Sequence, residues 1–70
     1  MTEQERKDVA VETLACEAGI PKEKAEKACA DLSAEDVRLV TFCLSGAMNP
    51  PLWASGLVAS LQEQRGEARS

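Results

Sequence analysis

Apolar and polar residues alternate with the period of an α-helix along most of this chain. In residues 3–18 and again in 21–32, apolar side chains recur every three or four positions, which places them on one face of a helix. Residues 34–45 form a third segment that is apolar around most of its circumference, and a fourth helical pattern runs from 50 to 64. The pattern therefore predicts an all-α fold, a compact bundle of about four short helices.

Residues with strong positional preferences stand at the expected helix ends. Thr2 and Ser33 precede acidic first turns, and their hydroxyls are suited to cap a helix N-terminus. Gly19 follows the first helix, where its freedom to adopt a left-handed conformation predicts a C-cap. Asn49 is expected to cap the last helix, with Pro50 in the first helical position. These signals predict where each helix begins and ends.

The length of the chain limits it to one small domain. A domain of 70 residues buries only about 60% of the surface that its unfolded form exposes, so its stability is marginal. Small domains often gain stability by self-association, which keeps a homodimer open as an alternative to a monomer. We expect a single helical domain over residues 1–64 and a flexible polar tail over residues 65–70.

The charge balance argues against nucleic acid as a partner. The chain has 8 basic and 12 acidic residues and a net charge of −4, whereas a protein that grips phosphate backbones needs a basic face. No apolar run approaches the roughly 20 residues of a membrane span, and the polar start MTEQERKDV does not resemble a signal peptide. We therefore expect a cytoplasmic protein that binds a protein partner and neither nucleic acid nor membrane.

The reactive side chains offer little for catalysis or metal binding. The chain has no histidine, and Cys16, Cys29 and Cys43 lie 13 and 14 residues apart, unlike the closely spaced ligands of a zinc site. Their odd number indicates free thiols, and their apolar neighbours predict that all three are buried in the core. Glu35 and Asp36 are adjacent carboxylates that diverge by about 100° on a helix. We expect no enzyme activity, no metal and no cofactor.

Residues 14–32, LACEAGIPKEKAEKACADL, have the outline of a helix-turn-helix motif with Gly19 at the turn. The second helix of this stretch lacks Arg, Asn and Gln, the side chains best suited to read base edges. We therefore interpret the stretch as a packing hairpin and keep DNA binding as the alternative. In that alternative the phosphate contacts would come from three lysines, Lys22, Lys24 and Lys27.

Part of this stretch, AGIPKEKAEKA, resembles the first helical hairpin of HU-type nucleoid proteins, which carries a similar AGxxKxxAEKA run. The resemblance covers about 20 of the 70 residues. It implies that the hairpin belongs to the body of a dimer. Proteins of that family hold DNA with basic β-arms, and because this sequence has no such arms, the resemblance does not imply DNA binding.

Large apolar residues in the last two helical segments exceed what a bundle of this size can easily hide. Exposed apolar patches often mark interfaces, and Trp is enriched among the residues that dominate binding energy. Small residues beside them would let a partner helix approach closely. Trp53 is equally compatible with a core position at the Pro50–Pro51 corner. The predicted partner-binding residues are Phe42, Leu52, Trp53, Gly56, Leu57 and Ser60.

These observations favour a small acidic intracellular interaction module, of the type encoded by phages or plasmids. Such a module binds and modulates a larger regulatory protein or enzyme. One alternative is a small helix-turn-helix transcription regulator that contacts DNA through residues 14–32. The other is a structural homodimer or an assembly subunit.

Overall fold

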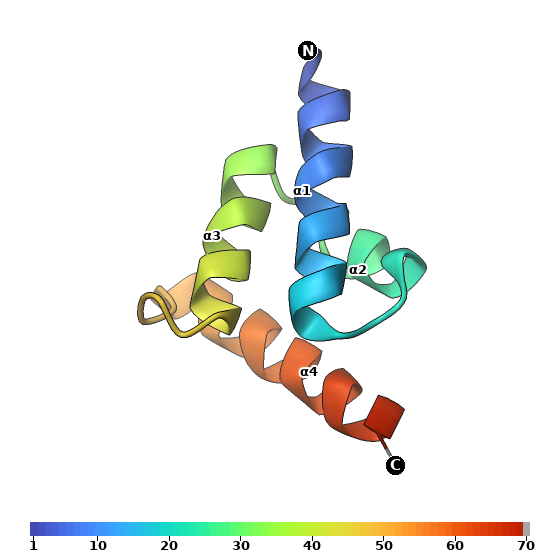
Figure 1. The fold of residues 1–70 in the computed structure, drawn as a ribbon. Coiled ribbons are helices and arrows are strands. Elements are labelled where there is room, and N and C mark those ends of the chain that lie inside the picture. The colour runs from blue at the N-terminus through green and yellow to red at the C-terminus, as the bar shows by residue number, and fades with distance from the viewer. Residues whose placement is uncertain (70) are drawn as a thin grey trace.

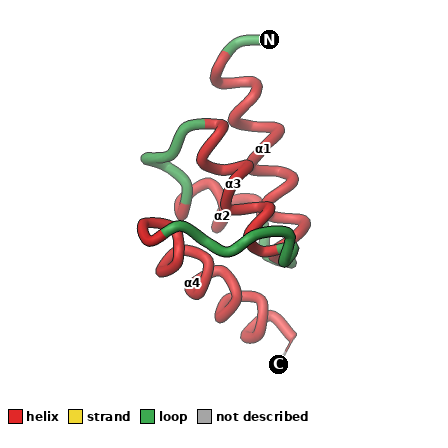
Figure 2. The backbone as a smooth tube through the Cα atoms, turned by 90° about the vertical axis from the view of Figure 1, so that its left-hand side faces the viewer, coloured by secondary structure: helices red, strands yellow, loops and turns green. Residues whose placement is uncertain are grey.

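The computed structural model describes the backbone of residues 1–69 and the side chains of residues 1–66. Four α-helices follow one another along the chain (Figure 1), namely α1 (Glu3–Ala18), α2 (Lys22–Ala28), α3 (Ala34–Leu44) and α4 (Leu52–Arg69). The described part of the chain contains no strand (Figure 2). The predicted all-α bundle of short helices is confirmed.

The helices pack in two directions. α1 and α3 lie side by side and run in the same direction, while α2 packs against α1 (Figure 1). α4 crosses near the C-terminal ends of α1 and α3 and contacts both. The core between them is aliphatic, without a buried polar or charged residue among those described. Its largest fully buried side chains are Leu14, Cys29, Val37, Val40 and Leu61.

Local hydrogen bonds fix the predicted helix starts. The Thr2 hydroxyl accepts a 3.2 Å bond from the Glu5 N–H, and the Ser33 hydroxyl accepts one of 3.2 Å from the Asp36 N–H. Each bond satisfies a backbone donor that has no partner inside its own helix. Gly19 ends α1 with a φ of 69°, the left-handed conformation that only Gly adopts without strain. The three predicted caps are confirmed.

Two hydrogen bonds tie the first half of α1 to residues just before α3 and at its start. The Lys7 ammonium donates to the Ala30 carbonyl at 2.9 Å, and the Glu3 carboxylate accepts from the Ala34 N–H at 3.4 Å. Both bonds join N-terminal parts of the two helices, in agreement with their parallel direction. The order of side chains along the α1–α3 pair follows from this direction.

The predicted ends of the second and fourth helices need correction. α2 ends at Ala28, three to four residues before the predicted end at Asp31 or Leu32. α4 begins at Leu52 rather than at Pro50, so Asn49 is not its cap. The residue before a proline is disfavoured in the helical conformation, and Pro50 stands directly before Pro51. The Pro51 carbonyl instead accepts from the N–H groups of the first turn of α4.

The end of α4 also differs from its prediction. The helix continues to Arg69, whereas the periodicity predicted an end near Gln64. The backbone of residues 65–69 is therefore helical, and the flexibility of the tail remains a prediction.

Candidate partner-binding surface

The start of α4 carries two large apolar side chains that do not enter the core. Leu52 is 95% exposed and Trp53 is 50% exposed. The buried face of α4 consists of Ala54, Val58 and Leu61 instead. Leu52 lies two positions before Ala54, about 200° away around the helix, which directs it to solvent.

The predicted small residues share the outer face with Leu52. Leu52, Gly56 and Ser60 are four positions apart, so they form one stripe along α4, and all three are exposed. A Cβ atom placed on Gly56 would meet no atom within 4 Å. Leu57 is partly buried and packs against the core, and it therefore borders this stripe instead of belonging to it.

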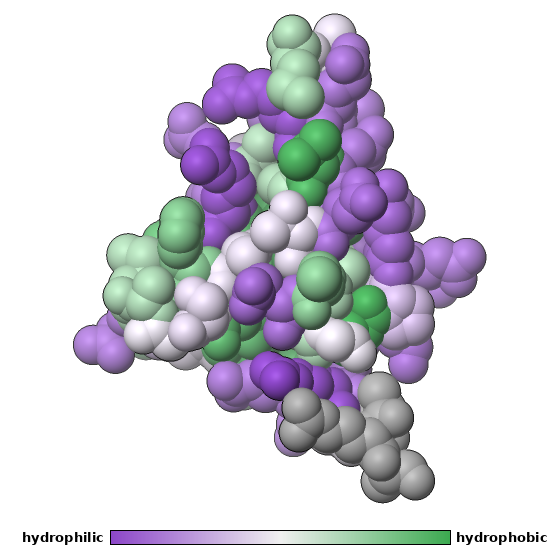
Figure 3. Space-filling model, in the orientation of Figure 1, coloured by the Kyte–Doolittle hydropathy of each residue, from purple (hydrophilic) through white to green (hydrophobic). Residues whose placement is uncertain are grey.

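The sixth predicted residue, Phe42, lies on α3 and is 50% exposed. Met48, in the loop between α3 and α4, is 47% exposed. Figure 3 shows apolar atoms gathered at the edge of the molecule that this loop forms. We call Phe42, Met48, Leu52 and Trp53 the apolar corner. Sequence reasoning found three of its members and missed Met48, which lay in a segment interpreted only as a helix break.

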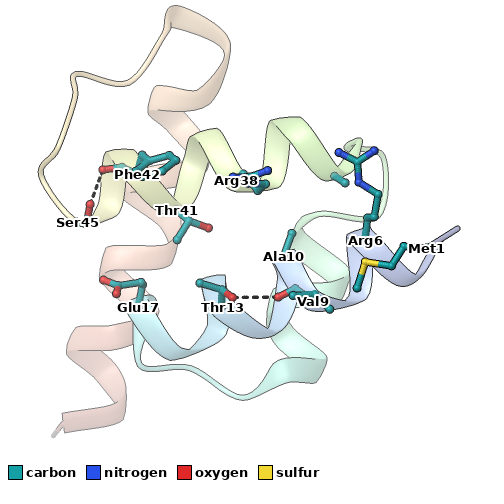
Figure 4. Close-up of a pocket in the computed structure, with 11 residues that line it drawn as sticks. Met1, Arg6, Val9, Ala10, Thr13, Glu17, Arg38, Thr41, Phe42 and Ser45 are labelled. Atoms are coloured by element: carbon teal, nitrogen blue, oxygen red, sulfur yellow. Dashed lines mark hydrogen bonds between the residues drawn. The ribbon is translucent and has the colours of Figure 1, made fainter. Parts of the chain in front are cut away.

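A second surface was not predicted from the sequence. A groove of about 530 Å³ runs between α1 and α3 (Figure 4). Val9, on α1, is 52% exposed in it, and Phe42 forms part of the opposite wall. The lining residues are Met1, Arg6, Val9, Ala10, Thr13, Glu17, Ala34, Arg38, Thr41, Phe42 and Ser45. The signal in the sequence was Val9, an apolar residue outside the buried stripe of α1.

The hydroxyl groups of the groove are already used by the helices that carry them. Thr13 donates to the Val9 carbonyl at 3.0 Å, and Thr41 donates to the Val37 carbonyl at 2.8 Å. Ser45 donates to the Phe42 carbonyl at 2.8 Å. These donors have partners within their own helices, so the middle of the groove is mainly apolar. The charged residues are Arg6, Arg38 and Glu17.

The cysteines divide into two classes. Cys29 and Cys43 are buried, as predicted, whereas Cys16 is exposed, which corrects the prediction for that residue. Cys16 lies about 200° around α1 from the fully buried Leu14, so it cannot share the core face. Burial raises the pKa of the Cys29 thiol, and the charge of Lys7 opposes this effect. No group of side chains in the described region could hold a metal ion.

The candidate DNA-binding lysines lie on a short and mixed surface. Lys22, Lys24 and Lys27 are all exposed on α2, which has 7 residues. Lys22 lies 4.0 Å from Glu26 in an ion pair that neutralises part of this face. Ile20 and Ala25 are buried against α1, as expected for a packing hairpin. This geometry gives the DNA-binding alternative no specific support.

Within the described residues, no helix is both long enough and apolar enough to cross a membrane. Comparison with protein-family models, with curated proteins and with solved structures found no match for this chain. Its function must therefore be argued from its own surfaces.

Proposed function

We propose that this chain is a small acidic cytoplasmic interaction module that binds a larger regulatory protein or enzyme through the apolar corner. The observation that carries the proposal is the exposure of Leu52 and Trp53, at 95% and 50%, at the start of one helix. Single exposed apolar residues are common on proteins, but here two large ones are adjacent, and the exposed Met48 precedes them by four and five residues in the loop before α4. A partner that covers them removes apolar surface from water, worth about 25 cal/mol per Å².

The neighbouring stripe on α4 supports a helical or flat partner surface. Gly56 and Ser60 continue the line that begins at Leu52, and neither projects a bulky side chain. A partner backbone can therefore approach α4 closely beyond the apolar anchors. The net charge of −4 favours a partner whose surface around the contact is basic.

Affinity capture with matched variants tests this proposal. The wild-type chain and the double variant Leu52→Asp/Trp53→Ala are used as baits in the native cell, and Ala30→Asp serves as an exposed control outside the corner. We expect one protein to be retained by the wild type and by the control and lost from the double variant. Circular dichroism of all three baits checks that they are folded. Equal retention by wild type and double variant contradicts the proposal.

A further inference from the structure

The groove between α1 and α3 is not part of the surface assigned above, apart from its wall at Phe42. Apart from Arg38, its middle is apolar, because Val9 and Phe42 are each about half exposed there and the hydroxyls of Thr13 and Thr41 bond their own helices. Residues of opposite charge lie at the two ends of the groove. Arg6 lies at one end beside the start of α3, and Glu17 lies at the other end beside Ser45 (Figure 4).

Helix direction reinforces this order. α1 and α3 run parallel, so the positive N-terminal ends of both helix dipoles lie at the Arg6 end of the groove. Both negative C-terminal ends lie at the Glu17 end. The acidic residues that begin α1 and α3 do not line the groove, and the carboxylate of one of them, Glu3, bonds the Ala34 N–H. An occupant of the groove therefore needs a negative end opposite Arg6 and a positive end opposite Glu17.

We propose that the occupant is a second copy of this chain, packed face to face with its α1 and α3 antiparallel to those of the first. The two-fold axis lies in the interface and runs perpendicular to the helices, so it reverses the direction of the second copy. The Glu17 end of each copy then lies over the Arg6 end of the other. Such an interface is isologous: residue i contacts j, and j contacts i. A parallel arrangement of the copies would instead place Arg6 near the partner's helix starts, where no carboxylate lines the groove.

The same axis gives a register for both helices. Arg6 and Glu17 are 11 residues apart on α1, or about 16 Å, and the axis crosses α1 midway, between Val9 and Thr13. Val9 of one copy then meets the apolar middle of the other. Arg38 and Phe42 both line the groove and are one turn apart on α3. An axis that crosses α3 between them brings the guanidinium of each copy to the aromatic ring of the other, a favourable cation–π pair.

The size of the domain gives the second copy a further role. A stable interface covers roughly 800 Å² on each partner, a substantial part of the 4616 Å² that this chain exposes. A chain of 70 residues buries little core by itself, and the dimer extends that core through the groove. Leu52, Trp53 and Gly56 do not line the groove and remain free in the dimer, and Phe42 is the one residue of the apolar corner that the groove shares. The dimer therefore does not depend on the function proposed above.

A charge-exchange experiment tests both the dimer and its orientation. Arg6→Glu and Glu17→Arg are made as separate variants, and both positions are exposed, so the fold should persist. Each variant alone places like charges opposite each other twice. In a mixed dimer, the carboxylate introduced at position 6 of one variant faces the guanidinium introduced at position 17 of the other. The native Arg6 and the native Glu17 face each other at the opposite end, so attraction is restored at both ends. Glu12→Arg, an exposed change on α1 outside the groove, is the control.

Sedimentation velocity over a range of concentrations measures the outcome, with thermal melts confirming folding. We expect the wild type and Glu12→Arg to dimerise, each groove variant alone to dimerise at least about tenfold more weakly, and their equimolar mixture to recover dimers. A wild type that stays monomeric up to about 1 mM overturns the proposal. At that concentration the experiment detects any dimer with a binding free energy more favourable than about −4 kcal/mol. Groove variants that dimerise like the wild type also overturn the proposal, and so does a mixture that stays monomeric. In either case a helix of another protein would be the alternative occupant of the groove.

Discussion

The α1–α3 pair and the apolar corner use the same kinds of residue in opposite ways. Along α1 and α3, Leu14, Val37 and Val40 are fully buried, and caps at both N-termini fix where the helices begin. At the corner, Leu52 and Trp53 stand at the start of a helix but face solvent. Hydrophobic periodicity locates a helix, but the neighbouring helices determine which of its apolar residues are covered.

The largest expected effect separates a core leucine from a corner leucine. Leu14→Ala removes a fully buried side chain and should lower the free energy of unfolding by about 2–5 kcal/mol, which is about half of the stability expected for a domain of this size. Leu52→Ala removes a side chain that is 95% exposed and should change it by less than about 0.5 kcal/mol. Urea denaturation followed by circular dichroism measures both, and similar losses would remove the distinction between the two regions.

Trp53→Ala tests whether Trp53 belongs to the core or to the partner-binding surface. Because the indole is 50% exposed, we expect a loss below about 2 kcal/mol, compared with about 3–5 kcal/mol for a fully buried Trp. The variant should keep the helical circular dichroism spectrum of the wild type and should fail in partner capture. A variant that unfolds would assign Trp53 to the core and would move the partner surface elsewhere.

The caps allow a smaller test within the α1–α3 pair. Ser33→Ala deprives the Asp36 N–H of its side-chain acceptor and should cost about 1 kcal/mol of unfolding free energy. Ser55→Ala, at an exposed hydroxyl that donates to the Leu52 carbonyl near the start of α4, is a control expected to change stability by less than about 0.5 kcal/mol. Thermal melts compare the two, and equal losses would show that the Ser33 hydroxyl does not act as a cap.

The thiols give the smallest energetic effect but a sharp kinetic contrast. A thiol reagent should label Cys16 rapidly in the native state, whereas Cys29 and Cys43 should react only as the protein opens. Mass spectrometry of a time course identifies each site. Rapid native labelling of Cys43 would show that the core around α3 opens readily.

The buried thiol also gives stability a dependence on pH. Burial raises the pKa of Cys29, so the folded state holds this proton more tightly than the unfolded chain does. The contribution of this thiol to the free energy of unfolding is fully present below the ordinary pKa of 9.0. It is lost as the pH rises through that value toward the higher pKa of the folded state. Cys29→Ala should reduce the loss of stability above pH 9, as measured by urea denaturation at several pH values; an unchanged dependence would contradict this account.

The sequence by itself determined the class of fold and most helix starts, because these depend on local chemistry. The Thr2 and Ser33 hydroxyls and the left-handed Gly19 act within one turn of their own positions, so their roles could be predicted. The start of α4 also depends on local chemistry, because Pro51 disfavours the helical conformation at Pro50. The prediction of a helix start at Pro50 overlooked this effect. The exposure of Cys16 could have been predicted from its angle of about 200° to Leu14 around the helix. Its apolar neighbours were given more weight, and they led to the wrong prediction that it is buried.

Only the tertiary structure decided which surfaces remain open. The exposure of Leu52 depends on where α4 crosses the other helices, and Val9 is exposed because no helix covers the α1–α3 groove on that side. Arg6 and Glu17 are 11 residues apart on the same helix, and the packing of α3 against α1 makes their positions the two ends of one groove. Contacts between residues far apart in the chain set these features, and hydrophobic periodicity carries no information about them.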